Sequence, residues 1–227
     1  MSAPDYGKTF GLLRTGAGQT WSDYTRHAFV EGLRDGSLPR ECFLHYLVQD
    51  YVFLVHFARA WSLGVVKSET QEEMRVCAQT VDALVNHEMS LHVKTCAAAG
   101  IDESALFNAA EADGNLAYTR YVLDAGMQGD FVDLVSALSP CVMGYGEIGL
   151  RLGAEKSADT PYSEWIATYA DPEYQGVCTT VGEMLDNAVA RRIGDLATSP
   201  RRASVQARFT KATALEVGFW QMGLSPQ

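Results

Sequence analysis

The chain has 227 residues, of which 47% are hydrophobic and 20% charged, and a formal net charge of −10. These values are typical of a soluble globular protein with a sizeable core. The acidic balance disfavours a nucleic-acid partner, since phosphate backbones are also negative, and no apolar run reaches the roughly 18 residues of a membrane span.

Apolar residues recur at helical spacing along most of the chain, and no segment alternates with a period of two. The pattern predicts helices over residues 20–35, 39–67, 68–99, 102–125, 130–152, 161–169, 172–197 and 201–222. Gly100 and Gly126 stand where two of these helices are expected to end. We therefore predict an all-α fold, in which residues 1–227 form a single-domain helical bundle of seven to eight helices.

The cysteines are odd in number and widely scattered, at Cys42, Cys77, Cys96, Cys141 and Cys178. They form no C-x-x-C pair and no metal-finger spacing, which indicates reduced thiols in a cytoplasmic protein. The first residues also lack the basic and apolar stretches of a secretory signal.

Cys141 differs from the other cysteines because it follows Pro140. Proline suits the first position of a helix, since it has no N–H to leave unpaired there. A cysteine in a first helical turn would be favoured as a thiolate by the free N–H groups and the helix dipole. Most lone cysteines are inert packing residues, so a reactive Cys141 needs support from elsewhere in the chain.

The histidines do not have the spacing of a metal site. His87 and His92 are five residues apart, which on a helix separates them by about 140°, whereas the H-E-x-x-H motif needs a spacing of four. No E-x-x-H motif of the di-iron type is present. We expect neither a metal nor another cofactor, and we expect the histidines to support structure or neighbouring side chains.

Three glycines match a nucleotide-binding pattern by their letters only. Gly144, Gly146 and Gly149 fit G-x-G-x-x-G, but that fingerprint has meaning only after a β-strand. Here they follow helix-forming sequence, so we expect them to permit close helix packing.

Two carboxylates interrupt otherwise apolar helices. Asp50 would be costly in an apolar helix unless it is paired, so we expect it to face a pocket and to have a ligand as its partner. Glu216 lies among large apolar residues, which should raise its pKa and suit it to proton donation. Should Glu216 not serve, Glu147 is the next candidate for this role. Tyr145 follows Cys141 by four residues and should share its face.

Taken together, these segments resemble the thiaminase II (TenA-like) family over nearly the whole chain. The resemblance is carried by six motifs in order: Gln49-Asp50-Tyr51-x-Phe53-Leu54, His87-Glu88 with His92, Tyr118-Thr119-x-Tyr121, Leu138-Ser139-Pro140-Cys141 with Tyr145-Gly146-Glu147-Ile148-Gly149, Tyr162-x-x-Trp165-Ile166-x-x-Tyr169, and Leu215-Glu216-x-x-Phe219-Trp220.

The resemblance implies a haem-oxygenase-like helical fold used without haem, and a homotetramer. It implies a thiamin-salvage hydrolase that converts 4-amino-5-aminomethyl-2-methylpyrimidine to the hydroxymethyl pyrimidine, and that acts more slowly on thiamin. By position, Cys141 takes the role of nucleophile and Glu216 that of acid and base. Asp50 would hold a ring nitrogen and the exocyclic amine. The pocket would be lined by Phe53, Tyr118, Tyr145 and Tyr169. Members of the family can carry Tyr where this chain has Phe53, so one hydrogen bond is missing here.

Three other functions remain open at this point: a non-catalytic pyrimidine-binding protein, a transcription regulator, and another haem-oxygenase-like enzyme that oxidises a small molecule. The acidic charge and the lack of a basic recognition helix disfavour the regulator. The presence of both Cys141 and Glu216 favours the hydrolase, since a sensor needs neither residue.

Overall fold

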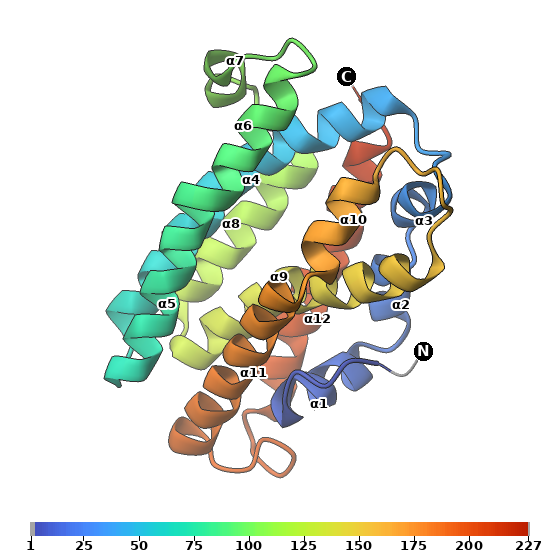
Figure 1. Cartoon of the computed structure of the whole chain (residues 1–227). Helices are drawn as coiled ribbons and strands as arrows, with labels where there is room; N and C mark the ends of the chain where they lie inside the picture. The colour runs from blue at the N-terminus through green and yellow to red at the C-terminus, as the bar shows by residue number, and fades with distance from the viewer. Residues whose placement is uncertain (1–2, 227) are drawn as a thin grey trace.

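The computed structural model describes residues 3–226, without the side chain of residue 91, and in that part of the chain every regular element is helical. The elements of the first half are α1 (Lys8–Ala17), α2 (Gln19–Thr25), α3 (Ala28–Asp35), α4 (Arg40–Lys67), α5 (Gln71–Ala83), a π-helical segment η1 (Leu84–Glu88) and α6 (Met89–Ala97). The second half contains α7 (Glu103–Phe107), α8 (Asp113–Gln128), α9 (Phe131–Glu155), α10 (Ser163–Ala170), α11 (Pro172–Arg192) and α12 (Arg202–Gly223) (Figure 1). The all-α prediction is confirmed.

The structure divides the chain more finely than the apolar pattern predicts. The expected helix 20–35 is broken before α3, where the His27 side chain accepts a hydrogen bond from the Phe29 N–H and so caps a new helix. The expected helix 102–125 is broken between α7 and α8. There the Gln49 amide bonds the Ala110 carbonyl and the Ala112 N–H, so a contact from α4 holds the break.

Local signals at helix ends agree with the structure in most places. Thr70 caps α5 by accepting from the Glu73 N–H, and Gly100 has φ +84°, a left-handed conformation that suits glycine. Gly126, however, does not end a helix, because α8 continues to Gln128. A Cβ at Gly126 would approach side-chain atoms of Leu134 and Leu63 to 2.9 and 3.0 Å, so this glycine serves close packing instead.

Helix α9 is the centre of the fold, and it packs against α8, α10, α11 and α12. Most of its residues are buried. Close packing along it depends on small residues, as the sequence predicts. A Cβ on Gly144 would meet the Tyr24 ring, and one on Gly149 would meet the backbone of Tyr169.

The helices beside α9 form two groups. Helices α5, η1 and α6 follow one another along a single rod that packs on α4, and α10 and α11 lie on the other side in the view of Figure 1. Between residues 3 and 226 no helix has both the length and the apolar character to cross a membrane.

Candidate active site

A cavity of about 1070 Å³ lies between these two groups of helices. It is lined by α4, α5, η1, α6, α9, α10 and α11. Its size is at the upper end of the roughly 300–1,000 Å³ of small-molecule sites. Of the residues that the sequence nominates, five line it: Asp50, Phe53, Cys141, Tyr145 and Tyr169. Tyr118 and Glu216 are almost fully buried and lie behind the wall.

Cys141 is the cysteine at the cavity, but it does not lie at a helix start. Pro140 is inside α9, so the prediction that it opens a helix is wrong. The Tyr24 hydroxyl donates to the Pro140 carbonyl, and packing on all sides holds a proline where it would normally break a helix. The thiol therefore gains nothing from a helix N-terminus. Burial, with the nearby charges of Glu216 and Asp50, holds the pKa of Cys141 well above its usual value.

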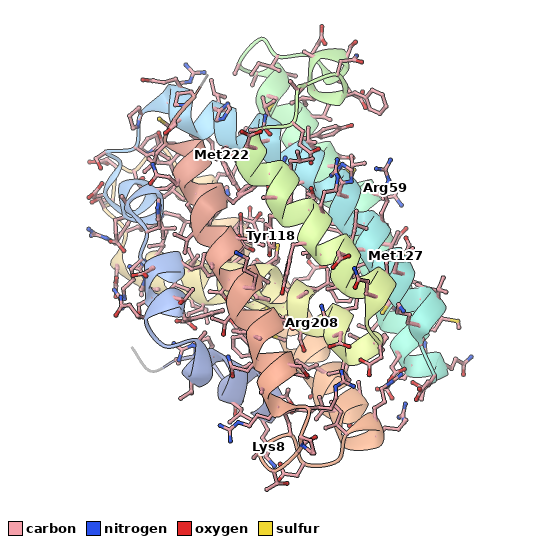
Figure 2. The ribbon with its side chains drawn as sticks, turned by 180° about the vertical axis from the view of Figure 1, so that it is seen from behind. Lys8, Arg59, Tyr118, Met127, Arg208 and Met222 are labelled. Carbon is pink, nitrogen blue, oxygen red and sulfur yellow. The ribbon has the colours of Figure 1, made fainter. Side chains whose placement is uncertain are left out.

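Glu216 lies close enough to this thiol for its negative charge to raise the pKa of Cys141. Its Oε1 accepts a hydrogen bond from the Tyr118 hydroxyl at 2.8 Å. Figure 2 shows Tyr118 in the interior, where α8 passes α12. Burial raises the pKa of Glu216 to about 8, which is the direction its apolar surroundings predict. The site therefore places a buried carboxyl group beside a buried thiol.

Asp50 lines the cavity from α4. One of its carboxyl oxygens is already bonded to protein side chains. Its Oδ2 lies 2.7 Å from His92 Nε2 and accepts a bond from the Tyr46 hydroxyl at 3.2 Å. The expectation that a ligand alone pairs with Asp50 is therefore wrong for this oxygen. Oδ1 is engaged by neither of the two residues. His92 supports a neighbouring side chain, as we expect for the histidines.

A further carboxyl, that of Glu88, lines the cavity from η1. It accepts a bond from the Tyr169 hydroxyl at 3.2 Å. Burial raises the pKa of Glu88 to about 7, and the nearby Asp50 adds to the rise. The π-helical turn that carries Glu88 is a feature found frequently at functional sites.

Aromatic rings form much of the inner wall. Tyr145 lies 4.9 Å from Tyr169 and 5.9 Å from Trp165, measured between ring centroids. Phe53 packs against Tyr118 at 5.0 Å. Flat rings of this kind suit a planar, electron-poor heterocycle.

Carboxyl groups dominate the charge of the cavity. Five carboxyl side chains line it, those of Asp50, Glu88, Glu164, Asp171 and Glu173, and the described lining contains neither lysine nor arginine. This arrangement suits a cationic ligand. The part of the chain that the structure describes contains no group of three or more His, Cys, Asp and Glu side chains that could hold a metal ion.

Sequence reasoning missed Glu88, Tyr46 and the pairing of His92. The available signal is the spacing of four between Glu88 and His92, which puts both on one face of a helix. The test for an H-E-x-x-H motif compares His87 with His92, which are five residues apart. It therefore does not reveal that Glu88 and His92 share a helix face.

The fold and the site together define an all-helical protein with an acidic, aromatic cavity, in which a thiol lies near a buried carboxyl group. Residues 16–225 match the model of the TENA/THI-4/PQQC family, and the chain belongs to this family.

Three relatives illustrate the match. An aminopyrimidine aminohydrolase of Halalkalibacterium halodurans is 34% identical over 204 residues, which cover 89% of each chain. A crystal structure described as a TenA family transcription regulator from a Silicibacter species is 58% identical, with a TM-score of 0.95 over 97% of this chain and 98% of that one. A Shewanella denitrificans domain with a heme oxygenase-like fold, 15% identical, superposes with a TM-score of 0.70 over 96% and 92% of the two chains. The haem-oxygenase-like fold is thereby confirmed.

Proposed function

We propose that the protein is a thiamin-salvage hydrolase of the aminopyrimidine aminohydrolase type, which converts 4-amino-5-aminomethyl-2-methylpyrimidine to the hydroxymethyl pyrimidine and ammonia. The enzyme class, a hydrolase of C–N bonds, is that of curated relatives aligned over most of the chain. The observation that carries the proposal is a thiol, Cys141, at the wall of an acidic, aromatic cavity, with the buried Glu216 close enough to raise the pKa of that thiol.

The proposed reaction begins with binding of the ring. The aminomethyl group is a cation at neutral pH, and the carboxyls of the cavity favour its approach. Asp50 Oδ1 would accept a hydrogen bond from the exocyclic amine. A bond from the same carboxyl group to the adjacent ring nitrogen needs a proton between the two, since both are otherwise acceptors. Tyr145 and Tyr169 would pack on the ring.

Bond breaking then needs a nucleophile and a proton donor. Glu216 in its ionised form takes the proton of Cys141, and the thiolate adds to the electron-poor pyrimidine. Glu216 now carries a proton. The ammonium group of the substrate first loses its extra proton to solvent, and Glu216 then donates to the neutral aminomethyl nitrogen as the bond between this nitrogen and the methylene carbon breaks and ammonia leaves. Water adds to the methylene carbon and its proton returns to Glu216. The thiolate finally leaves the ring and recovers its proton.

The raised pKa values of Cys141 and Glu216 have a consequence for this scheme. In the absence of ligand, burial disfavours negative charge on either group. A bound cation offsets that cost, so the thiolate would form mainly when the substrate is present. This protects the nucleophile from unwanted chemistry.

The test is an ammonia assay with purified protein and 4-amino-5-aminomethyl-2-methylpyrimidine, with Cys141→Ser as the matched control. We expect ammonia and the hydroxymethyl pyrimidine in equal amounts from the unmodified protein. Thiamin should be consumed more slowly. Tight binding of the pyrimidine without ammonia release would instead support the non-catalytic binding function.

The proposed assembly is a homotetramer. Among the side chains that the structure describes, three large apolar ones are more than two-thirds exposed: Val66, Phe107 and Met127 at 80, 72 and 70%. They lie on α4, α7 and α8, and α4 contacts both other helices. Such exposed residues on adjoining elements support an interface between copies, which sedimentation would test. The five cysteines are free, which supports a reducing, cytoplasmic environment.

A further inference from the structure

The ring of His92 is held at both of its nitrogens. Nδ1 lies 2.9 Å from the backbone carbonyl of Glu88, and Nε2 lies 2.7 Å from Asp50 Oδ2. Asp50 and His92 are 3% and 4% exposed, so water does not replace these bonds readily. With both nitrogens engaged, His92 has no polar atom left for a ligand, although its ring lines the cavity. It can act on a bound molecule only through Asp50.

The two contacts fix where the protons are. A backbone carbonyl only accepts, so Nδ1 must carry a hydrogen. If Nε2 and Oδ2 were both without a hydrogen, two lone pairs would face each other at 2.7 Å. One proton therefore lies between His92 and Asp50. Burial lowers the pKa of His92, but the hydrogen bond and negative charge of Asp50 outweigh it and raise the value to about 9.

Tyr46 completes the support of the same oxygen. Its hydroxyl accepts from Trp165 Nε1 at 3.3 Å and donates to Asp50 Oδ2 at 3.2 Å. Oδ2 is thus bonded by two donors from two helices, α4 and α6. The carboxyl group cannot rotate without the loss of both bonds, which leaves Oδ1 as the oxygen available for other partners.

We propose that His92 is a positioning residue, which holds Asp50 Oδ2 from behind so that Oδ1 meets the exocyclic amine of a bound aminopyrimidine. The inference rests on the proposed function, since it takes an aminopyrimidine as the ligand of Asp50. The proton between the two residues also offsets the charge of Asp50. The acidic cavity therefore keeps this carboxyl as an oriented acceptor without the full cost of an isolated buried charge.

The test is a double-mutant cycle on pyrimidine affinity. The proteins are the unmodified chain, His92→Phe, Asp50→Asn and the double variant. The dissociation constant of 4-amino-5-hydroxymethyl-2-methylpyrimidine is measured by calorimetry, and kcat and KM by ammonia release. We expect His92→Phe to weaken binding by about 10- to 100-fold beside an intact Asp50. In the Asp50→Asn background the same change should alter binding by less than about twofold.

Two further measurements separate positioning from a structural role. His92→Gln keeps an N–H donor near Oδ2, so it should recover most of the lost affinity. It also carries the test if His92→Phe does not fold. A pyrimidine without the exocyclic amine should bind the unmodified protein and His92→Phe almost equally. His56→Gln is the matched control, since His56 lies on α4 like Asp50 but contacts Arg120 and Glu111 instead.

Equal losses of affinity in the two backgrounds would overturn the positioning role, because a structural defect does not depend on Asp50. Normal ammonia release by the unmodified protein together with such equal losses would leave the hydrolase proposal in place. Failure of the unmodified protein to bind any aminopyrimidine would overturn both proposals.

Discussion

The Tyr118 hydroxyl donates to Glu216 at 2.8 Å from a position 98 residues away in the chain. Both side chains are almost fully buried, so this bond fixes one oxygen of a carboxyl group whose charge acts on the Cys141 thiol. Tyr118 and Glu216 do not line the cavity, but through this contact Tyr118 holds the carboxyl group that is proposed to transfer protons.

Replacement of the thiol tests the nucleophile. Cys141→Ser should lose nearly all ammonia release, since a hydroxyl is a far weaker nucleophile at neutral pH. Serine variants of Cys42, Cys77, Cys96 and Cys178 should keep their activity, because those four are buried away from the cavity, although their packing can weaken. Full turnover by Cys141→Ser would contradict the covalent mechanism.

Replacement of the acid tests proton transfer. Glu216→Gln should bind the pyrimidine but lower kcat by about 10²–10⁴-fold, because the amide has no proton to transfer. Turnover and calorimetric binding would be measured on the same preparation. A variant with the unmodified rate would move proton transfer to another carboxyl. That group would be Glu88, since Glu147 is bonded to Arg14 at 2.7 Å and to Trp21 and is not at the cavity.

The raised pKa of Glu216 also predicts a pH dependence of stability. Between its ordinary value of 4.5 and about 8, the folded protein holds a proton that the unfolded chain releases. This contribution to stability is fully present below about pH 4.5 and is lost as the pH rises through about 8. Glu216→Gln should therefore reduce the fall in unfolding free energy between about pH 5 and pH 8, measured with denaturant. Glu183→Gln, at an exposed position of α11, is the control for the loss of a carboxyl group as such. An unchanged slope in Glu216→Gln would contradict the pKa assignment.

Replacement of Asp50, the proposed partner of the pyrimidine ring, should weaken both ligand binding and the stability of the fold. From the sequence alone, Asp50→Ala is expected to leave stability intact or to raise it, because a buried charge disappears. The bonds from His92 and Tyr46 reverse this expectation. Loss of their acceptor should lower the unfolding free energy by about 1–3 kcal/mol, and pyrimidine affinity should fall strongly. Calorimetry that found unchanged affinity would leave Asp50 as a helix-to-helix contact only.

Phe53→Tyr tests the departure from other family members. Phe53 lies between Phe57 and Phe219, with ring centroids 5.1 and 5.4 Å away. An added hydroxyl keeps the stacking surface and supplies one hydrogen bond of about 0.5–1.5 kcal/mol. The ratio of kcat/KM for the aminopyrimidine and thiamin should change by about 2- to 10-fold. No change in this ratio would show that the missing hydroxyl does not affect substrate preference.

Helical periodicity and local end signals were sufficient to predict the all-α class, the long helices α4, α9 and α12, and the placement of Asp50 and Glu216 in apolar surroundings. They depend on spacing within one helix, which the sequence determines directly. The same local rules failed at Pro140 and Gly126. There the packing of neighbouring helices outweighs the intrinsic preference for a helix end, because it stabilises the helix by more than one lost backbone bond costs.

The pairings within the site were decided only by the tertiary structure. Asp50 and His92 are 42 residues apart, and Tyr118 and Glu216 are 98 apart. Periodicity shows which residues share a face of one helix, but it carries no information on which faces of different helices meet. That choice follows from how α4, α8 and α12 bury their apolar surfaces around α9 and how α6 packs on α4. It brings acids that are far apart in the chain into one site.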